Sequence, residues 1–108
     1  MYYPLSATLI EFLILSIVEK NDSYGYGISQ TIKLVTNINE STLYPILKKL
    51  EKEDFLTTYS QEHQGRKRKY YSITSSGKEQ LIFLKSEWQS YKFALDGIIE
   101  GSLRHDKD

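Results

Sequence analysis

The chain of 108 residues carries no cysteine, which excludes disulfides and thiolate metal sites and is typical of a protein in a reducing compartment. A hydrophobic fraction of 40% and a charged fraction of 26% are ordinary for a globular protein, and the length allows one domain with one core of modest size. The longest apolar run, residues 9–18, contains Glu11 and is shorter than the roughly 20 apolar residues of a membrane-spanning helix. It also lacks the basic flank of a signal peptide, so we expect a cytoplasmic protein without a membrane partner.

The formal net charge of zero hides an uneven distribution of charge along the chain. Residues 1–23 and residues 79–108 each carry a net charge of −2, whereas residues 24–78 carry +4. A basic middle between acidic ends indicates an anionic partner for the middle segment, which the total alone would not suggest.

The first two expected helices are short and apolar. A helix over residues 6–20 has apolar residues around most of its circumference, which predicts a central place in the core, and Thr8 with Glu11 fits a capping box near its start. A turn at residues 20–23 separates it from a second helix over residues 26–36. One face of that second helix carries Ile28, Ile32 and Val35, at the i, i+4 and i+7 spacing.

A third helix is predicted by the segment STLYPILKKL, residues 41–50, with Asn39 as a plausible N-cap and Glu53 and Asp54 at its end. Proline costs about 3 kcal/mol in a helix interior but much less in the first turn, so Pro45 indicates a helix that begins close to Ser41 or bends near the proline. Its buried stripe is expected to hold Leu43, Ile46, Leu47 and Leu50, with Ser41, Tyr44 and Lys48 on the opposite side and Lys49 beside them.

Two runs rich in Thr, Tyr and Ile, residues 55–60 and 69–74, are typical of the strands of a hairpin. The polar segment between them, residues 61–68, contains Gly65 and three cationic side chains. This segment is longer than a tight turn, so we expect a loop that projects from the domain.

The last helix is expected over residues 75–100, capped by Thr74, Ser75 or Ser76, with Ser76 and Glu79 fitting a capping box. Its apolar residues recur every three or four positions in an a/d heptad pattern. A seam of this kind needs a partner, and a second copy of the chain is the simplest one. The expected dimer interface consists of Leu81, Leu84, Trp88, Tyr91, Leu95 and Ile98.

Three helices, a basic hairpin and a long helix predict a mainly α fold with a small β-hairpin (α+β), a winged helix-turn-helix followed by a dimerisation helix. At this point the chain also resembles the PadR-like transcriptional regulators from about Leu9 to Ile98. The matching pieces are YGYGI (residues 24–28), TLYPILKKLEKEDFL (42–56) and GRKRKYYSITSSGKEQL (65–81). We therefore expect a DNA-binding domain at residues 1–74, a dimerisation helix at 75–100 and a flexible tail at 101–108.

The resemblance implies a homodimeric repressor of the small subgroup of the family, which has a single C-terminal helix. Family members usually have glycine where this chain has Asp54. A glycine there would supply a left-handed helix C-cap, and because aspartate tolerates that conformation better than most residues, we expect a small stability cost and no change of fold.

Double-stranded DNA is the expected partner. Side chains of the third helix can bond to phosphates and base edges, and the cationic hairpin segment suits insertion beside a phosphate backbone, although charge runs are often merely solvated. The resemblance also places the start of the second helix near phosphates. We expect one of its two tyrosines to be buried in the core, and the sequence does not decide which. The expected DNA contacts are Tyr24, Tyr26, Ser41, Thr42, Tyr44, Lys48, Lys49, Arg66, Lys67 and Arg68.

Trp88 has two interpretations. It is either a core residue of the dimer or, as the resemblance to multidrug-binding small members implies, a platform for planar aromatic ligands, with Tyr91 and Phe12 in the same wall.

Enzyme activity, a metal site and a cofactor are not expected, because His63 and His105 have no companions at catalytic or ligand spacing. Two alternatives stay open: a winged-helix protein-interaction module that does not bind DNA, and a repressor without a small-molecule ligand.

Overall fold

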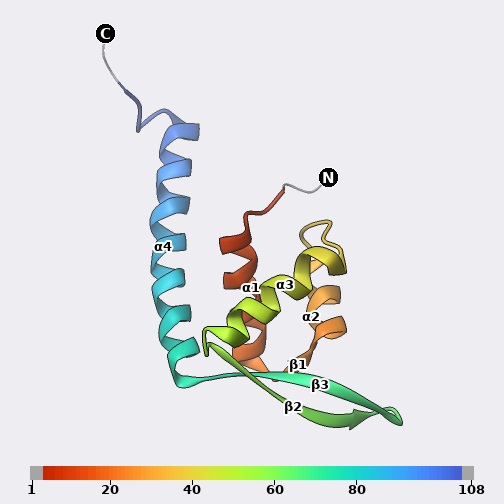
Figure 1. Cartoon of the computed structure of the whole chain (residues 1–108). Coiled ribbons are helices and arrows are strands. Elements are labelled where there is room, and N and C mark those ends of the chain that lie inside the picture. The colour runs from red at the N-terminus through yellow and green to blue at the C-terminus, as the bar shows by residue number, and fades with distance from the viewer. Residues whose placement is uncertain (1–3, 106–108) are drawn as a thin grey trace.

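Four helices and a three-stranded antiparallel sheet make up residues 4–105, the part of the chain that the structure, a computed structural model, describes (Figure 1). The predicted winged-helix fold of the α+β class is confirmed, with one addition: a short strand, β1, pairs with the hairpin and gives the strand order β1-β3-β2. The elements are α1 (Ala7–Lys20), β1 (Ser23–Tyr24), α2 (Gly25–Ile32), α3 (Glu40–Lys52), β2 (Leu56–His63), β3 (Arg66–Ile73) and α4 (Ser75–Glu100).

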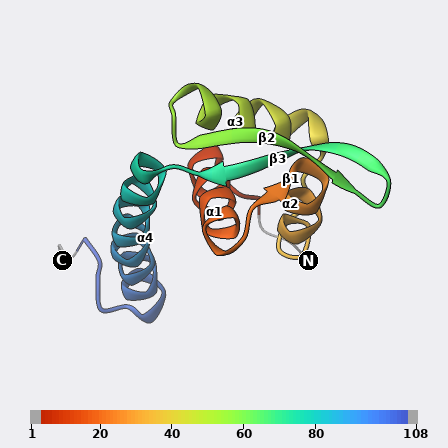
Figure 2. The ribbon, with the colours of Figure 1, turned by 90° about the horizontal axis from the view of Figure 1, so that it is seen from below.

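Helix α1 lies at the centre of the domain, between α2 and α4, as both ribbon views show (Figure 2). Its residues Ile14 and Leu15 have no exposed surface, in agreement with the predicted central helix. The stripe predicted for α3 is also confirmed, since Leu43, Leu47 and Leu50 are fully buried and Ile46 packs against the core at partial exposure.

The predicted capping box of α1 is wrong. The helix begins earlier than that motif requires, because the Ser6 hydroxyl accepts the amide of Leu9 at 3.2 Å and serves as the N-cap. Thr8 therefore lies inside the helix, and Glu11 is buried and bonded to a different helix.

Helix α2 is shorter than predicted, and Val35 is 54% exposed instead of sharing a buried face with Ile28 and Ile32. The amides of Leu34 and Val35 bond to carbonyls three residues back, so the chain tightens after Ile32 and leaves the 3.6-residue period. Beyond this turn Ile38 enters the core, and Asn39 caps α3 as predicted, accepting the amide of Thr42 at 3.0 Å.

Asp54 ends α3 in the left-handed conformation that the sequence suggested, with φ of 64°. The amides of Asp54 and Phe55 bond to the carbonyls of Glu51 and Leu50, each at 3.0 Å, which is a Schellman motif. The Asp54 carbonyl oxygen in turn accepts hydrogen bonds from the hydroxyls of Thr74 and Ser76. These two bonds connect the end of α3 to the start of α4.

We expect Asp54→Gly to raise the free energy of unfolding by about 0.5–1 kcal/mol. A left-handed L-residue costs roughly 1–2 kcal/mol, which exceeds the extra chain entropy of glycine, and a carboxylate at a helix C-terminus opposes the helix dipole. Urea unfolding measures the change. Asp54→Ala is the control and should lower stability, and a glycine variant no more stable than wild type would contradict the expectation.

The predicted loop at residues 61–68 is wrong, because the hairpin closes through a two-residue turn at Gln64 and Gly65. Both residues have positive φ, 54° and 79°, which is the signature of a type I′ turn and matches the twist of paired strands. Arg66, Lys67 and Arg68 consequently lie on β3, paired with residues 61–63 of β2, and their side chains alternate between the two faces of the wing.

Helix α4 has the predicted bounds. Its N-cap is Thr74, whose hydroxyl accepts the amide of Gly77 at 2.9 Å, so the Ser76–Glu79 capping box is wrong. The predicted division of the chain at residue 75 coincides with the start of this helix and stays a prediction, as does the flexible tail, whose residues 106–108 lie outside the described part. Within residues 4–105 there is no helix long and apolar enough to cross a membrane.

Candidate nucleic-acid interface

The exposed side of α3 and the wing meet in two adjoining hollows. One is lined by Tyr44, Lys48, Glu51, Lys52, Lys69 and Tyr71. The other is lined by Tyr24, Gly25, Tyr26, Tyr44, Lys67, Arg68, Lys69 and Tyr71. Six of the predicted DNA contacts therefore converge on one continuous region. We call it the α3–wing surface and define it by its tyrosine and cationic side chains: Tyr24, Tyr26, Tyr44, Lys48, Lys52, Lys67, Arg68, Lys69 and Tyr71.

Tyr44 lies at the junction of the two hollows and is 40% exposed. Its ring rests on Gly25, the first residue of α2, where a Cβ atom would come within 2.7 Å of both the ring and the hydroxyl oxygen. A larger residue at position 25 would therefore displace the ring, so the glycine allows Tyr44 to lie where it does.

The remaining predicted contacts lie outside the two hollows. Ser41 and Thr42 are exposed in the first turn of α3, where the Ser41 hydroxyl donates to the Asn39 side chain at 2.6 Å. Arg66 is exposed at the tip of the wing. The expectation that one of the two tyrosines at the start of α2 is buried in the core is wrong: Tyr24 is half-buried beside Tyr70 and His63 of the sheet, and Tyr26 is 51% exposed.

Lys49 points toward α1, where its ammonium lies 2.7 Å from a carboxylate oxygen of Glu11. Glu11 is only 8% exposed, and the hydrogen bond and charge of Glu11 raise the pKa of Lys49. The charge of Lys49 is thus already compensated inside the domain, whereas Lys52, one turn beyond Lys48, lines the hollow in its place.

Glu51 is a site residue that sequence reasoning missed. Its two carboxylate oxygens accept hydrogen bonds from the hydroxyl of Thr58 on β2 and the ammonium of Lys69 on β3, each at 3.3 Å. This side chain therefore joins the last turn of α3 to the wing. Only the long-range pairing of helix and sheet brings these three residues together, and no local spacing indicates it.

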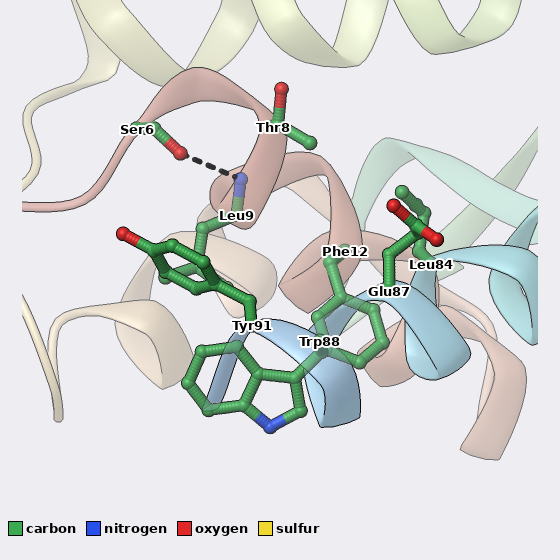
Figure 3. A pocket seen from close by; sticks show the side chains of 8 residues that line it. All are labelled: Ser6, Thr8, Leu9, Phe12, Leu84, Glu87, Trp88 and Tyr91. Carbon is green, nitrogen blue, oxygen red and sulfur yellow. Dashed lines mark hydrogen bonds between the residues drawn. The ribbon is translucent and has the colours of Figure 1, made fainter. Parts of the chain in front are cut away.

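A separate apolar cavity of about 280 Å³ lies between α1 and α4 (Figure 3). It brings together the three residues predicted as a ligand site, and the rings of Trp88 and Tyr91 lie 6.5 Å apart at an angle of 50°. Sequence reasoning missed the other lining residues as parts of this site; Leu84, four residues before Trp88 on the same helix, could have been found from that spacing. The full lining is Ser6, Thr8, Leu9, Phe12, Leu84, Glu87, Trp88 and Tyr91.

The predicted seam of α4 divides into two parts. Leu81 and Leu84 pack against the core of their own chain, and Leu84 is only 7% exposed, so neither is freely available to a partner. Farther along the helix, apolar side chains remain exposed on and beside the seam: Tyr91, Phe93, Leu95, Ile98 and Ile99.

Residues 4–105 contain no group of three His, Asp or Glu side chains that could hold a metal ion. His63 lies beside Tyr24 on the wing, and His105 lies beyond the end of α4.

Comparison with known proteins agrees with this architecture. Residues 14–82 match the model of the transcriptional regulator PadR-like family. The crystal structure of smu.1704 from Streptococcus mutans UA159 is 67% identical, with a TM-score of 0.94, and the match covers 98% of this chain and 100% of that one. A PadR family transcription regulator from Clostridium difficile R20291 is 34% identical, with a TM-score of 0.77 and coverage of 83% and 97%.

The negative transcriptional regulator PadR of Bacillus subtilis (strain 168) is 34% identical over 79 residues. The match covers 68% of this chain and 43% of that protein, so this chain spans less than half of its length. With a family model over most of its length and a matching fold, the chain belongs to the PadR-like family of transcriptional regulators.

Proposed function

We propose that this regulator is a sequence-specific DNA-binding repressor that acts as a homodimer. The observation that carries the proposal is the α3–wing surface: five cationic side chains and four tyrosines gather there in a chain whose net charge is zero. Glu51 is the one acid in the two lining sets, and it is held by Lys69. Such a surface suits phosphate oxygens and base edges, with α3 in the major groove and the wing beside it.

The exposed apolar side chains of α4 support the homodimer. The C-terminal part of helix α4 extends beyond the other helices (Figure 1), and Tyr91, Leu95 and Ile98 on the predicted seam are 59%, 39% and 62% exposed. Burying such residues against a second α4 would remove apolar surface from water. Two-fold symmetry would then require a pseudo-palindromic operator with half-sites about one helical turn apart.

The experiment that tests DNA binding compares two neighbouring lysines of α3. Fluorescence anisotropy would follow binding to the DNA upstream of the protein's own gene, and to scrambled DNA, over a salt series. Because Lys48 lines the hollow, Lys48→Gln should flatten the slope of log affinity against log salt by about 0.9 for each phosphate that the lysine neutralises. Lys49→Gln should leave the slope unchanged and lower the melting temperature, since it leaves the Glu11 carboxylate buried without its partner.

Weak binding that is equal for both DNAs and indifferent to both substitutions would contradict the repressor and favour the protein-interaction module. Selective binding with a slope that depends on Lys49 but not on Lys48 would contradict the proposed orientation of α3.

We propose as a second function that the cavity between α1 and α4 binds a planar aromatic ligand, which relieves repression. The cavity supports this proposal because its lining is mostly apolar and includes the rings of Phe12, Trp88 and Tyr91 (Figure 3). A ligand can control DNA binding only as far as it favours one arrangement of the two DNA-binding domains over another.

Trp88 is the single tryptophan of the chain, so its fluorescence reports on the cavity. We expect flat aromatic compounds to quench it in a saturable manner with dissociation constants on the order of 1–10 μM, the range that drug-sized ligands reach at ordinary efficiency. Tyr91→Ala should weaken the binding. If a varied panel of compounds leaves the Trp88 emission unchanged, the proposal of a ligand is wrong. The proposal of a DNA-binding repressor is not affected by that result.

A further inference from the structure

Three tyrosine rings lie in a row on one face of the small sheet, with the rings of Tyr59 and Tyr70 stacked and that of Tyr24 tilted against Tyr70. Tyr70 lies at the centre, because the strand register sets Tyr24 of β1 opposite it on one side and Tyr59 of β2 opposite it on the other. The ring centroids of Tyr24 and Tyr59 lie 5.4 and 5.7 Å from that of Tyr70. The Tyr59 hydroxyl donates to Asp22 at 2.7 Å, which fastens the row to the turn after α1.

Arg68 rests on the Tyr24 ring, at one end of this row. The two-residue period of β3 puts Arg68 on the same face as Tyr70, and its guanidinium carbon lies 4.7 Å from the centre of the Tyr24 ring. This is within the range of a cation–π interaction. The Nε atom is enclosed and has no hydrogen-bond partner among residues 4–105, while the side chain as a whole keeps part of its surface exposed.

The arrangement distinguishes Arg68 from its neighbours Arg66 and Lys67, which are exposed on the same strand. A long cationic side chain loses rotational freedom when it binds, and one that is already held in place loses less. Arg68 and Tyr24 are both among the residues that line the hollow containing Tyr26 and Tyr44, so the Tyr24 ring holds Arg68 at the border of the α3–wing surface.

We propose that Tyr24 is a positioning residue for DNA binding, which acts through its ring by holding the Arg68 guanidinium for a backbone phosphate and does not use its own hydroxyl to contact DNA. This inference rests on the proposed DNA-binding function and assigns separate roles to two residues of the same surface. Phosphate is the chemistry that a held guanidinium suits, because it accepts two parallel N–H bonds from the planar group.

The test uses the full chain, the same upstream DNA and a salt series, with four variants. Tyr24→Phe keeps the ring and should bind within about twofold of wild type. Tyr24→Leu removes the ring and should weaken binding about tenfold with an unchanged salt slope, since the charge remains. Arg68→Gln should weaken binding and flatten the slope by about 0.9 for each phosphate that the arginine neutralises. The double variant Tyr24→Leu/Arg68→Gln should bind no more weakly than Arg68→Gln alone.

Tyr26→Leu is the matched control, because this exposed tyrosine lines the same hollow without stacking on Arg68; its effect should add to that of Arg68→Gln. The inference is overturned if Tyr24→Phe weakens binding as much as Tyr24→Leu, which would assign the contact to the hydroxyl, or if the Tyr24→Leu and Arg68→Gln effects add. Wild-type protein that binds both DNAs weakly and equally overturns the proposed function together with the inference.

Thermal melting checks that each variant folds. If Tyr24→Leu does not fold, the test is the proton NMR signal of the Arg68 Nε–H group, measured on the wild-type protein without DNA. This signal is assigned by its absence from the spectrum of Arg68→Gln. A guanidinium held over the ring gives a ring-current-shifted, slowly exchanging signal in both wild type and Tyr24→Phe. A signal at the free-arginine position that exchanges rapidly overturns the inference.

Discussion

Gly77→Ala is expected to lower the free energy of unfolding by about 3 kcal/mol, the upper end for overpacking a well-filled site. A Cβ atom on Gly77 would lie 2.1 Å from the carbonyl oxygen of Phe55 and 2.8 Å from a side-chain carbon of Ile73. The Phe55 carbonyl also accepts a hydrogen bond from the amide of Thr74 at 3.1 Å, so moving it aside would break that bond. The first turn of α4 must therefore shift away from the sheet, or the end of α3 must open.

Urea unfolding of Gly77→Ala beside Gly97→Ala, a substitution in the same helix, checks this expectation. A Cβ atom on Gly97 meets only the side chains of Leu103 and Ser102, the nearest at 3.0 Å, and alanine has a helix propensity about 1 kcal/mol better than glycine. The control should therefore change stability by no more than about 1 kcal/mol. Equal stability of the two variants would contradict the close contact of α4 with Phe55.

Local sequence patterns were sufficient to predict the bounds of α4 and the buried side of α3. The bounds of α4 followed from a sustained apolar period and a run of capping residues, and the buried stripe of α3 followed from the same 3.6-residue rule. The left-handed conformation of Asp54 was expected from the resemblance, because family members usually have glycine at this position after the helix. In each case the decisive interactions lie within a few residues of one another in the chain.

The wing was predicted less well, because polar composition does not separate a loop from an exposed strand. Gln64 and Gly65 give no strong turn signal of the Asn-Gly kind, yet they close the hairpin, and the strands extend by pairing along their whole length. The alternation that sends Arg68 to one face and Lys69 to the other depends on that register, so the Arg68–Tyr24 contact could not be predicted from the segment alone.

The site residues show the same limit. Lys48 and Lys49 are adjacent lysines that the sequence predicts equally as DNA contacts. Only the packing of α1 against α3 gives Lys49 the buried partner Glu11. Lys69 and Glu51 are joined across 18 positions of the chain, and the hollow that they help to line belongs to the tertiary fold. Sequence reasoning therefore predicted residues that gather on one surface but not which of its charges are already compensated.

The second large effect is expected from the combined substitution Arg66→Ala/Lys67→Ala/Arg68→Ala, which should weaken binding to the upstream DNA at least about a hundredfold at low salt. If each of the three cations neutralises one phosphate, the salt slope should fall by about 2.7 for each subunit. All three side chains lie on a strand that is paired with β2, and two of them are exposed, so the backbone of the wing should survive their removal. Anisotropy over a salt series gives both quantities, and thermal melting monitors the fold.

A charge-matched control removes three lysines that lie away from the α3–wing surface: Lys33→Ala/Lys85→Ala/Lys92→Ala, at the end of α2 and on α4. Charges farther than a Debye length, about 10 Å at 0.1 M salt, act weakly, so the control should change affinity by no more than about threefold. Equal reductions of affinity in the two triple variants would mean that DNA responds to overall charge and not to the wing. A reduction confined to the wing variant would require contact at β3, because both proteins carry the same net charge and only the position of that charge differs.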